Sequence, residues 1–571
     1  MCGIFAYVGS ETDAPQQTLE GLKKLEYRGY DSWGVAHLNS EELQVTKKTG
    51  KIGEASISAA HTSKIAIGHT RWATHGGITV ENAHPHLNPD HTIAVVHNGV
   101  VENFAELKAS LPDYPFKSET DTEVITALLS ETLKTTEPLE TALSVAQKLK
   151  GLNAFVTLFL KTNQIIAYKN GSPLIIGKSE TGHYLASDNT ALAGIATDVL
   201  YLEDQQLAVI TGGSIELFDA KSKKLQGKWQ PLTLSADMID KQDFPHFMIK
   251  EINEQPSVVA KLSQQSFSIP AKKKIVLVGC GTAYHACVAA TYFLAIHKKQ
   301  SAQAFSGSEF LPWRELVDAD THVVFVSQSG ETIDIVEHAQ WLKNNGHHFT
   351  AVVNRKDSTL ARLATKVIDL AAGPEICVLA TKSFTAKLVT FLSLAGVGGT
   401  TDIPNSIAEI LKPGFKDLYI LPAVKVLERS PHLFILGKHE MYAMAMEAAL
   451  KVKESTYLHA EAFASGELKH GVLALIEKGT PVFALIPDSA AAADVTTGAQ
   501  EVKARGGYLI GVGSPNNKSD VFDHYIPVGG QGLAATIPVS VVFQLIAYYT
   551  TVALGRDPDK PRNLAKSVTV K

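Results

Sequence analysis

The second half of the chain repeats itself, and this repeat constrains the fold more than any other feature of the sequence. When the sequence is laid on itself with an offset of about 158 residues, three apolar runs match. The matched runs are residues 275–279 with 433–437, 323–326 with 481–484, and 349–353 with 508–512. Helical stretches separate them, and this alternation predicts parallel strands with helices on both faces of each sheet. We therefore expect two similar α/β lobes.

Length, charge and cysteine spacing narrow the kind of protein. A chain of 571 residues is too long for one ordinary hydrophobic core, so several domains are expected. The 53 basic residues nearly balance the 58 acidic ones, which gives no basic field for nucleic acid and favours a small-molecule enzyme. The 4 cysteines lack disulfide or metal-ligand spacing, so we expect a reducing compartment, the cytoplasm. We expect neither a metal nor a cofactor.

One uncharged stretch, residues 533–555, meets the length criterion for a membrane span. It contains Pro538, Ser540 and Gln544, and the repeat matches it to a polar-edged segment after Thr381. These features favour a buried core helix, so we expect no membrane partner.

The N-terminal half has a different pattern, with short alternating runs that are typical of strands. We expect strands at residues 3–8, 65–68, 93–96, 154–160, 165–169 and 207–210, and two helices at about 15–25 and 122–132. A sandwich of sheets covered by helices fits this pattern. A polar, turn-prone passage at residues 220–250 marks the expected boundary with the repeat.

Cys2 stands directly behind the initiator methionine. If Met1 is removed, one residue carries a thiol and a free α-amine, and an amine with a pKa of about 7.7–8 accepts a proton near neutrality. The alternatives are an ordinary buried cysteine and a lipidated one, but no lipobox precedes Cys2. Four polar motifs follow in order, at residues 28–32, 69–76, 97–99 and 118–123.

Together these motifs resemble the glutaminase half of the class II glutamine amidotransferases, which implies an N-terminal nucleophile hydrolase-type αββα sandwich. Cys2 would be the nucleophile, with Asn98 and the backbone N–H of Gly99 as the oxyanion hole. A free amino acid needs a cation and an anion on opposite walls, and Arg71 and Asp121 suit these roles. The implied glutamine-binding residues are Arg28, Arg71, Trp72, Thr74, His75 and Asp121.

Six histidines lie between His69 and His97. They lack consistent metal-ligand spacing, so we expect hydrogen-bonded supporting histidines rather than a metal site.

A second constellation begins after the apolar run 323–326. Residues 327–332 open a helix, where hydroxyls, an amide and unpaired N–H groups suit a phosphate. A simple helix N-cap is the alternative, and the missing Walker lysine argues against a nucleoside triphosphate. The loop resembles the sugar-phosphate loop of sugar isomerase (SIS) domains. The sugar-phosphate-binding residues that this implies are Gly281, Thr282, Ser327, Gln328, Ser329, Thr332 and Val378.

Helical spacing places Glu447, Lys451 and Glu454 within about 60° of arc on one face of a helix. With residues 459–461, 466–471 and 561–570, this helix resembles the isomerising glutamine–fructose-6-phosphate aminotransferases, and the resemblance covers essentially the whole chain. It implies glutamine and fructose 6-phosphate as substrates, glucosamine 6-phosphate as product, and a homodimer. The implied catalytic residues are Cys2, Asn98, Gly99, Glu447, Lys451, Glu454, His470 and Lys566.

In that family Lys566 would engage the open-chain sugar carbonyl, Glu454 would move a proton between C1 and C2, and His470 would open the sugar ring. The chemistry agrees, because turning a 2-ketose into a 2-amino aldose needs a carbonyl-reactive amine, a base and a general acid. Ala283 and Ala380 stand where the family usually has serines, a departure that bears on substrate affinity rather than on reaction type.

The expected domains are a glutaminase domain at residues 2–225, a linker at 226–247, two SIS-type α/β parallel-sheet lobes at 248–405 and 406–555, and a tail at 556–571. Two alternatives stay open: a related transferase for another keto-sugar phosphate, and a non-catalytic sugar-phosphate sensor. A sensor has no need for Cys2 or Lys566.

Overall fold

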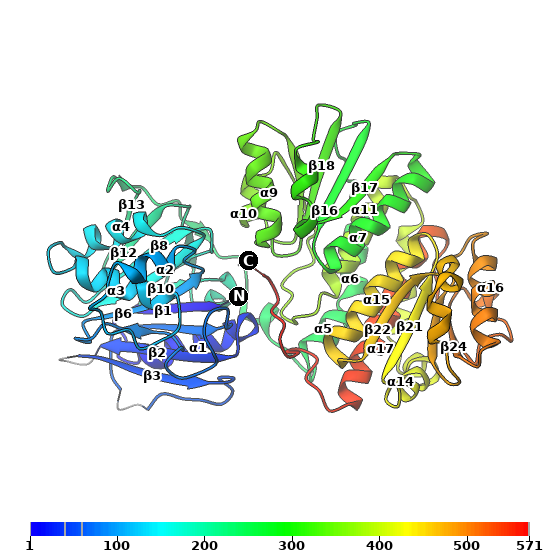
Figure 1. Ribbon diagram of the computed structural model, residues 1–571, viewed down its shortest axis with the longest axis horizontal. Coiled ribbons are helices and arrows are strands. Elements are labelled where there is room, and N and C mark those ends of the chain that lie inside the picture. Colours follow the sequence, from blue (N-terminus) through cyan, green and yellow to red (C-terminus); the bar gives the residue numbers. More distant parts are fainter. Residues whose placement is uncertain (1, 39–41, 59–60, 569–571) are drawn as a thin grey trace. The chain divides into compact units, whose positions relative to one another are not determined.

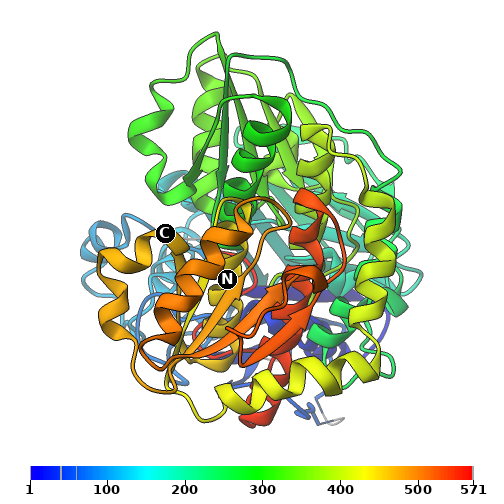
Figure 2. The same ribbon diagram turned by 90° about the vertical axis from the view of Figure 1, so that its right-hand side faces the viewer.

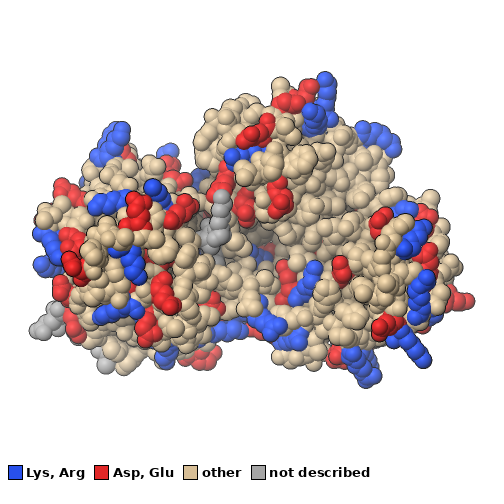
Figure 3. All heavy atoms as spheres, in the orientation of Figure 1, with Lys and Arg blue, Asp and Glu red and all other residues tan. Residues whose placement is uncertain are grey.

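The computed structural model describes residues 2–38, 42–58 and 61–568 (Figure 1). Contacts divide the chain into two compact units. The N-terminal unit runs to Asp240 and also holds the segment from Ala565 onward, and the second unit spans Lys241–Leu564. On the face shown in Figure 3, basic and acidic side chains are interspersed over the described residues of each unit.

Two antiparallel sheets form the N-terminal unit. The eight-stranded sheet has the order β15 (Gln230–Pro231), β11 (Asp198–Tyr201), β9 (Ile175–Lys178), β10 (Gly182–Ala186), β1 (Gly3–Gly9), β4 (Ile65–Arg71), β2 (Ser32–Leu38) and β3 (Leu43–Thr49). The seven-stranded sheet has the order β14 (Lys224–Leu225), β13 (Ile215–Phe218), β12 (Gln206–Ile210), β8 (Gln164–Asn170), β7 (Asn153–Phe159), β6 (Ile93–Gly99) and β5 (His86–Leu87).

The alternation of side chains along β1 explains the layers of this unit. Ile4, Ala6 and Val8 enter the apolar cluster that joins the two sheets, whereas Phe5 and Tyr7 point to the opposite face. There they pack with helix α1 (Ala14–Leu25). On the outer face of the other sheet, α3 (Thr122–Thr132) and α4 (Pro138–Lys148) form a third cluster with β6, β7 and β8. The αββα sandwich expected from the sequence is confirmed.

The six expected strands and the two expected helices are present in this unit, but the expectation of only two helices was wrong. The structure adds α2 (Phe104–Ala109) and α4. Helix α2 buries no residue, and the buried face of α4 includes Pro138, Thr141 and two alanines, so neither segment shows a strong apolar period.

Two five-stranded parallel sheets form the second unit. The first has the order β17 (Ala302–Ser306), β16 (Lys274–Gly279), β18 (Thr321–Ser327), β19 (Phe349–Val353) and β20 (Lys366–Asp369). The second has the order β22 (His459–Ala464), β21 (His432–Gly437), β23 (Pro481–Leu485), β24 (Tyr508–Gly513) and β25 (His524–Pro527). The shared order confirms the repeat. In such sheets ligands bind at the carboxyl ends of the strands where the order reverses, here between β16 and β18.

The two lobes share one hydrophobic core. A single apolar cluster joins the inner faces of both sheets to helices α7 (Thr282–Phe293), α11 (Lys382–Ala395), α15 (Glu440–Thr456) and α17 (Thr536–Ala553). Figures 1 and 2 show helices of this unit lying between its two sheets. The outer faces carry separate clusters with α9 (Ile333–Asn344) in one lobe and α16 (Ala492–Lys503) in the other.

Helix α17 lies within the stretch that meets the length criterion for a membrane span. By length and composition residues 532–553 pass that test, but 83% of the apolar window is buried inside the protein. Its side chains, among them Val539, Phe543 and Ile546, belong to the shared core. The stretch is a core helix, as in soluble proteins, and the sequence interpretation is confirmed.

Candidate active sites

Cys2 lies at the start of β1, beside the end of β4. The backbone N–H of Trp72 donates to the Cys2 Sγ at 3.3 Å, and the Gly3 N–H donates to the Thr70 hydroxyl at 3.1 Å. Burial raises the pKa of the Cys2 thiol, against the opposing effects of the Trp72 N–H and the Arg71 guanidinium. A thiol that stays protonated near neutrality needs a base to become a nucleophile, and the α-amine of the same residue would be the nearest one.

Asn98 and Gly99, the residues expected to form the oxyanion hole, lie at the end of β6. The Asn98 Nδ2 donates to the backbone carbonyl of Cys2 at 3.1 Å, so the two residues meet as the sequence predicts. Gly99 has a φ of +135°, and a Cβ at this position would lie 2.2 Å from the Leu152 carbonyl oxygen. A larger side chain would collide with the neighbouring main chain, so only glycine fits here.

Arg71 is buried and holds the loop that follows it. Its guanidinium donates to the backbone carbonyls of His75 at 2.5 Å, Gly76 at 3.2 Å and Gly77 at 2.9 Å. Glu119 accepts from the Gly77 N–H at 3.1 Å and so fixes the same loop from its other side. The cation expected to bind the carboxylate of glutamine therefore also organises a loop beside Cys2.

The other expected glutamine-binding residues line this loop or lie near it. Trp72 is half-buried with its ring edge against Tyr30, and His75 is half-buried against Phe104. Thr74 is exposed.

Arg28 and Asp121 contact protein groups in this structure. The Arg28 Nη1 donates to the buried carboxylate of Asp188 at 2.6 Å, and its Nε donates to the Cys2 carbonyl at 3.4 Å. Asp121 accepts from the Val101 N–H at 2.7 Å. Asp188, which sequence reasoning missed, therefore anchors the arginine that contacts the main chain of the nucleophile.

The histidines around this site form a buried, neutral group. The rings of His69 and His84 lie 4.2 Å apart and those of His84 and His86 lie 4.8 Å apart, while the two nitrogens of His97 contact Thr122 and Asn153. Among residues 2–38, 42–58 and 61–568, no group of three or more His, Cys, Asp or Glu side chains is arranged to hold a metal ion.

These histidines make the N-terminal unit sensitive to acid. Burial lowers the pKa of His69 to about 3 and the pKa of each of His84, His86 and His97 below 6.5. Below about pH 6.5 the unfolded chain then binds more protons than the folded one. The free energy of unfolding should therefore fall as the pH drops through this range, by up to about 1.4 kcal/mol per pH unit for each histidine. We expect the amide protection factors, which are corrected for the intrinsic slowing of exchange in acid, to fall more in β4 and β6 than in β23 and β24 between about pH 7.5 and about pH 5.5. An equal fall in both pairs of strands would contradict this assignment.

In the second unit, the expected phosphate loop joins β18 to α9. The Ser327 hydroxyl accepts from the Gly330 N–H at 3.0 Å and lies 3.2 Å from the Thr332 hydroxyl. Ser329 accepts from the Glu331 N–H at 3.2 Å, and the Gln328 carbonyl accepts from the Asn354 N–H at 3.1 Å. Thr332 is the N-cap residue of α9 but makes no side-chain cap. The loop is thus a closed turn at a helix N-terminus.

A buried charge network connects the two lobes. Glu447 on α15 contacts two residues of α7. It accepts from the Thr282 hydroxyl at 3.0 Å and lies 2.8 Å from the His285 Nδ1. The Lys451 Nζ lies 3.4 Å from Glu447 and 2.6 Å from Glu454. Sequence reasoning predicted this stripe but missed His285, which lies one helical turn after Thr282.

The charges of this network hold each other ionised. Burial opposes ionisation of Glu447, but Lys451, His285 and Thr282 hold its pKa below the ordinary value. Burial likewise opposes the charge of Lys451, but Glu447 and Glu454 raise its pKa above the ordinary value.

The remaining expected sugar-site residues lie apart from this network or stay unplaced. The Gly281 turn opens α7 with a φ of +52°, and the Val378 N–H donates to the Asp559 carbonyl at 3.2 Å. His470 is exposed at the end of a short 3-10 turn. Lys566 belongs to the terminal segment that groups with the N-terminal unit, so its expected role at the sugar stays a prediction. Ala283 replaces a polar residue with a methyl group that is part of the shared core.

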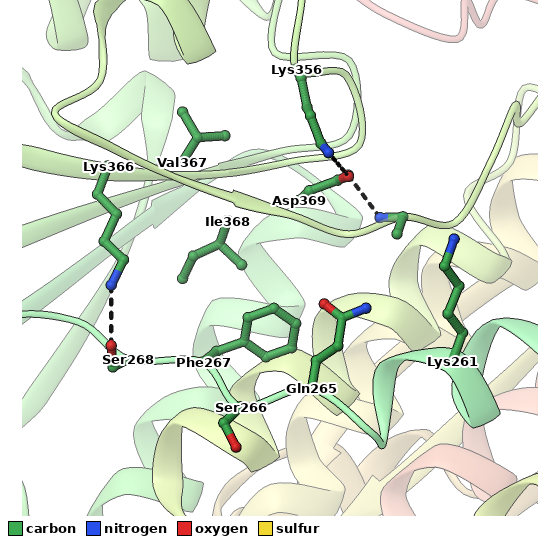
Figure 4. Close-up of a pocket in the computed structure, with 11 residues that line it drawn as sticks. Lys261, Gln265, Ser266, Phe267, Ser268, Lys356, Lys366, Val367, Ile368 and Asp369 are labelled. Atoms are coloured by element: carbon green, nitrogen blue, oxygen red, sulfur yellow. Dashed lines mark hydrogen bonds and ion pairs between the residues drawn. The ribbon is translucent and has the colours of Figure 1, made fainter. Parts of the chain in front are cut away.

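A cavity of about 370 Å³ lies away from all of these residues. It is formed by β20 and the chain that follows α6 (Gln255–Leu262), and its lining includes Lys261, Phe267 and Lys366 (Figure 4). Lys356 pairs there with Asp369 at 2.8 Å, and Lys366 donates to Ser268 at 3.1 Å. None of the site residues expected from the sequence lines it.

Comparisons with known proteins agree with this organisation. Residues 69–194 match the model of the glutamine amidotransferase domain, and residues 268–396 and 426–553 match that of the SIS domain. The glutamine–fructose-6-phosphate aminotransferase [isomerizing] of Clostridium acetobutylicum is 37% identical over 613 aligned residues, and that of Thermus thermophilus is 37% identical over 609, each covering 100% of both chains. A solved C-terminal domain of glucosamine-fructose-6-phosphate aminotransferase from Francisella tularensis is 29% identical over 56% of this chain and 99% of that chain, with a TM-score of 0.49. The chain therefore belongs to the family of isomerising glutamine–fructose-6-phosphate aminotransferases.

Proposed function

We propose that the chain transfers the amide nitrogen of glutamine to fructose 6-phosphate and isomerises the product to glucosamine 6-phosphate. The observation that carries this function is the joint presence of two sites in one family member: Cys2 with Asn98, and Glu447 with Lys451 and Glu454. A sugar-phosphate sensor needs neither the half-buried nucleophile nor the proton-transfer residues, so an enzyme explains the two sites better.

In the glutaminase half, the Cys2 thiolate attacks the glutamine carboxamide after its own α-amine has taken the thiol proton. The oxyanion is stabilised by the Asn98 amide and the Gly99 N–H. The contact between the Asn98 Nδ2 and the Cys2 carbonyl supports this role. Arg71 and Asp121 bind the two charged groups of the amino acid, and Trp72, Thr74 and His75 lie beside them. Arg28 positions the main chain of Cys2 from its ion pair with Asp188.

In the isomerase half, the phosphate of the sugar binds the loop of Ser327, Gln328, Ser329 and Thr332, with Gly281, Thr282 and Val378 nearby in the family's site. Lys566 engages the open-chain carbonyl, His470 opens the ring and Glu454 carries the proton between C1 and C2. The Lys451 Nζ lies 2.6 Å from the Glu454 carboxylate and holds this base in place. His470 is exposed within this chain, which supports the proposal that a homodimer partner's site receives it.

The proposal extends to the setting of the enzyme. The buried α17 and the free cysteines Cys2, Cys280, Cys287 and Cys377 support a soluble cytoplasmic protein. Nucleic acid and membrane partners are not proposed. We also propose five parts of the chain: a glutaminase domain at residues 2–225, a linker at 226–247, two SIS lobes at 248–405 and 406–555, and a tail at 556–571.

Incubation with both substrates tests the function directly. Glucosamine 6-phosphate and glutamate should form in equal amounts, and a panel of other keto-sugar phosphates should give much lower rates. Formation of a different amino sugar would favour the related-transferase alternative, whereas binding without turnover would favour the sensor.

The phosphate loop can be tested by a pair of glycine variants. Gly330 has a φ of +65°, and a Cβ there would lie 2.1 Å from the Ser358 hydroxyl, so Gly330→Ala must displace the loop. We expect the KM for fructose 6-phosphate to rise about 10-fold or more, with glutamine hydrolysis retained. Gly346→Ala is the matched control, because its φ is +76° and nothing lies within 4 Å of the added Cβ. Equal KM values in the two variants would contradict the role of this loop.

A further inference from the structure

His69 is buried behind the oxyanion hole, and its contacts fix which of its nitrogens carries a proton. The Nε2 lies 2.9 Å from the His97 backbone carbonyl and 3.1 Å from the Asn98 Oδ1. A backbone carbonyl can only accept a hydrogen bond, so the Nε2 is the protonated nitrogen. The atom of Asn98 that faces the same N–H must then be its oxygen.

This contact and the Cys2 carbonyl together determine the orientation of the Asn98 amide. Because Oδ1 faces His69, the Nδ2 is turned the other way, where it donates to the Cys2 carbonyl at 3.1 Å. The two ends of an asparagine amide are nearly identical in size, so packing alone does not select between them. A flipped amide would present its oxygen to the developing oxyanion and would repel the charge that the site has to stabilise.

The state of His69 suits this purpose. Its ring is fully buried, lies 4.2 Å from the ring of His84, and is uncharged because burial lowers its pKa to about 3. Its Nδ1 has no hydrogen-bond partner among residues 2–38, 42–58 and 61–568. All polar contacts of the ring therefore run through the one N–H that faces His97 and Asn98.

We propose that His69 is a positioning residue of the glutaminase site, whose Nε2–H holds the Asn98 amide with its N–H group directed at the reacting carbonyl. This inference rests on the proposed function of Cys2 and Asn98. It assigns to this buried histidine a specific task in addition to its packing against His84.

The test compares two substitutions of His69 in the full-length enzyme. His69→Leu fills the buried position with an apolar side chain and removes the N–H donor. We expect kcat for glutamine hydrolysis to fall about 10-fold to 100-fold, with KM changed less than about threefold. In His69→Gln the amide nitrogen can reach the position of the Nε2, and kcat should return to within about fivefold of the parent. Ammonia-dependent synthesis should be the same in both variants. His37→Leu is the control. This buried histidine contacts the carbonyl of the neighbouring Leu38 through its Nδ1, and its replacement should leave kcat unchanged.

A double-mutant cycle separates positioning from a general structural effect. In an Asn98→Ala background there is no amide to orient, so His69→Leu should cause less than about a twofold further loss of kcat. Two results would overturn the proposal: a further 10-fold to 100-fold loss of kcat on adding His69→Leu to Asn98→Ala, or a kcat of His69→Gln as low as that of His69→Leu. If His69→Leu does not fold, His69→Asn replaces it, because its shorter amide keeps polarity but does not reach both acceptors. A parent enzyme without glutaminase activity would refute the proposed function itself, which is a different result from any of these.

Discussion

Cys2→Ala should abolish glutamine hydrolysis and glutamine-dependent synthesis, with a loss of about 10⁴-fold or more, while synthesis from added ammonia continues. The physical reason is that the oxyanion hole and the amino-acid clamp remain, but no nucleophile is left to form the thioester. The thiol occupies a small, half-buried position at the start of β1, and its removal leaves Asn98 bound to the main-chain carbonyl. Steady-state assays with glutamine and with ammonium salts measure the two activities separately.

The control for this variant is Cys287→Ala, which removes a thiol buried in the shared core of the second unit. Burial raises the pKa of Cys287, so it is inert as a nucleophile, and its loss should leave glutamine hydrolysis intact. Glutaminase activity that survives in Cys2→Ala would remove the basis of the proposed chemistry. Mass spectrometry of the active parent should also find the initiator methionine absent, since the α-amine serves as the base.

Lys451→Met should eliminate sugar isomerisation and destabilise the second unit by about 3–5 kcal/mol. Lys451 is almost completely buried between two carboxylates, 3.4 Å from Glu447 and 2.6 Å from Glu454. Without the ammonium group, Glu447 keeps its charge in a buried position, and Glu454 loses its ion-pair partner. Thermal unfolding and isomerase assays report the two effects.

Lys453→Met is the matched control for this substitution. It lies two residues away on the same helix and is exposed, so stability and isomerase activity should change little. Glutamine hydrolysis should persist in both variants. A stable, active Lys451→Met enzyme would show that the network of Thr282, Glu447 and Lys451 has no part in catalysis.

The sequence predicts the central elements of the fold far better than the edges of its sheets. Strands β16, β18, β21 and β23 are continuous apolar runs because helices cover both of their faces. The edge strands β17 and β20 were not predicted, and the structure shows that most of their residues are only partly buried or exposed. An edge strand needs fewer apolar side chains, so its sequence carries a weaker signal.

The active-site motifs were predictable, but their supporting residues were not. Cys2, Asn98 and Glu447 belong to recognisable local patterns, and the structure places each with a partner that the sequence also named. Asp188, by contrast, lies 160 residues after Arg28, and no local spacing relates the two. Tertiary structure alone creates that ion pair. Contacts of this kind fix the orientation of a catalytic group without leaving a short motif in the chain.

The common core of the two lobes has a consequence for how this region can be divided. One hydrophobic cluster contains Phe384 and Leu388 of the first lobe and Met444 and Phe543 of the second. A gene fragment encoding either lobe alone would therefore yield a polypeptide with a large solvent-exposed apolar surface. Such fragments should precipitate on expression unless both are produced together. Each lobe thus depends on the other to cover its inner face.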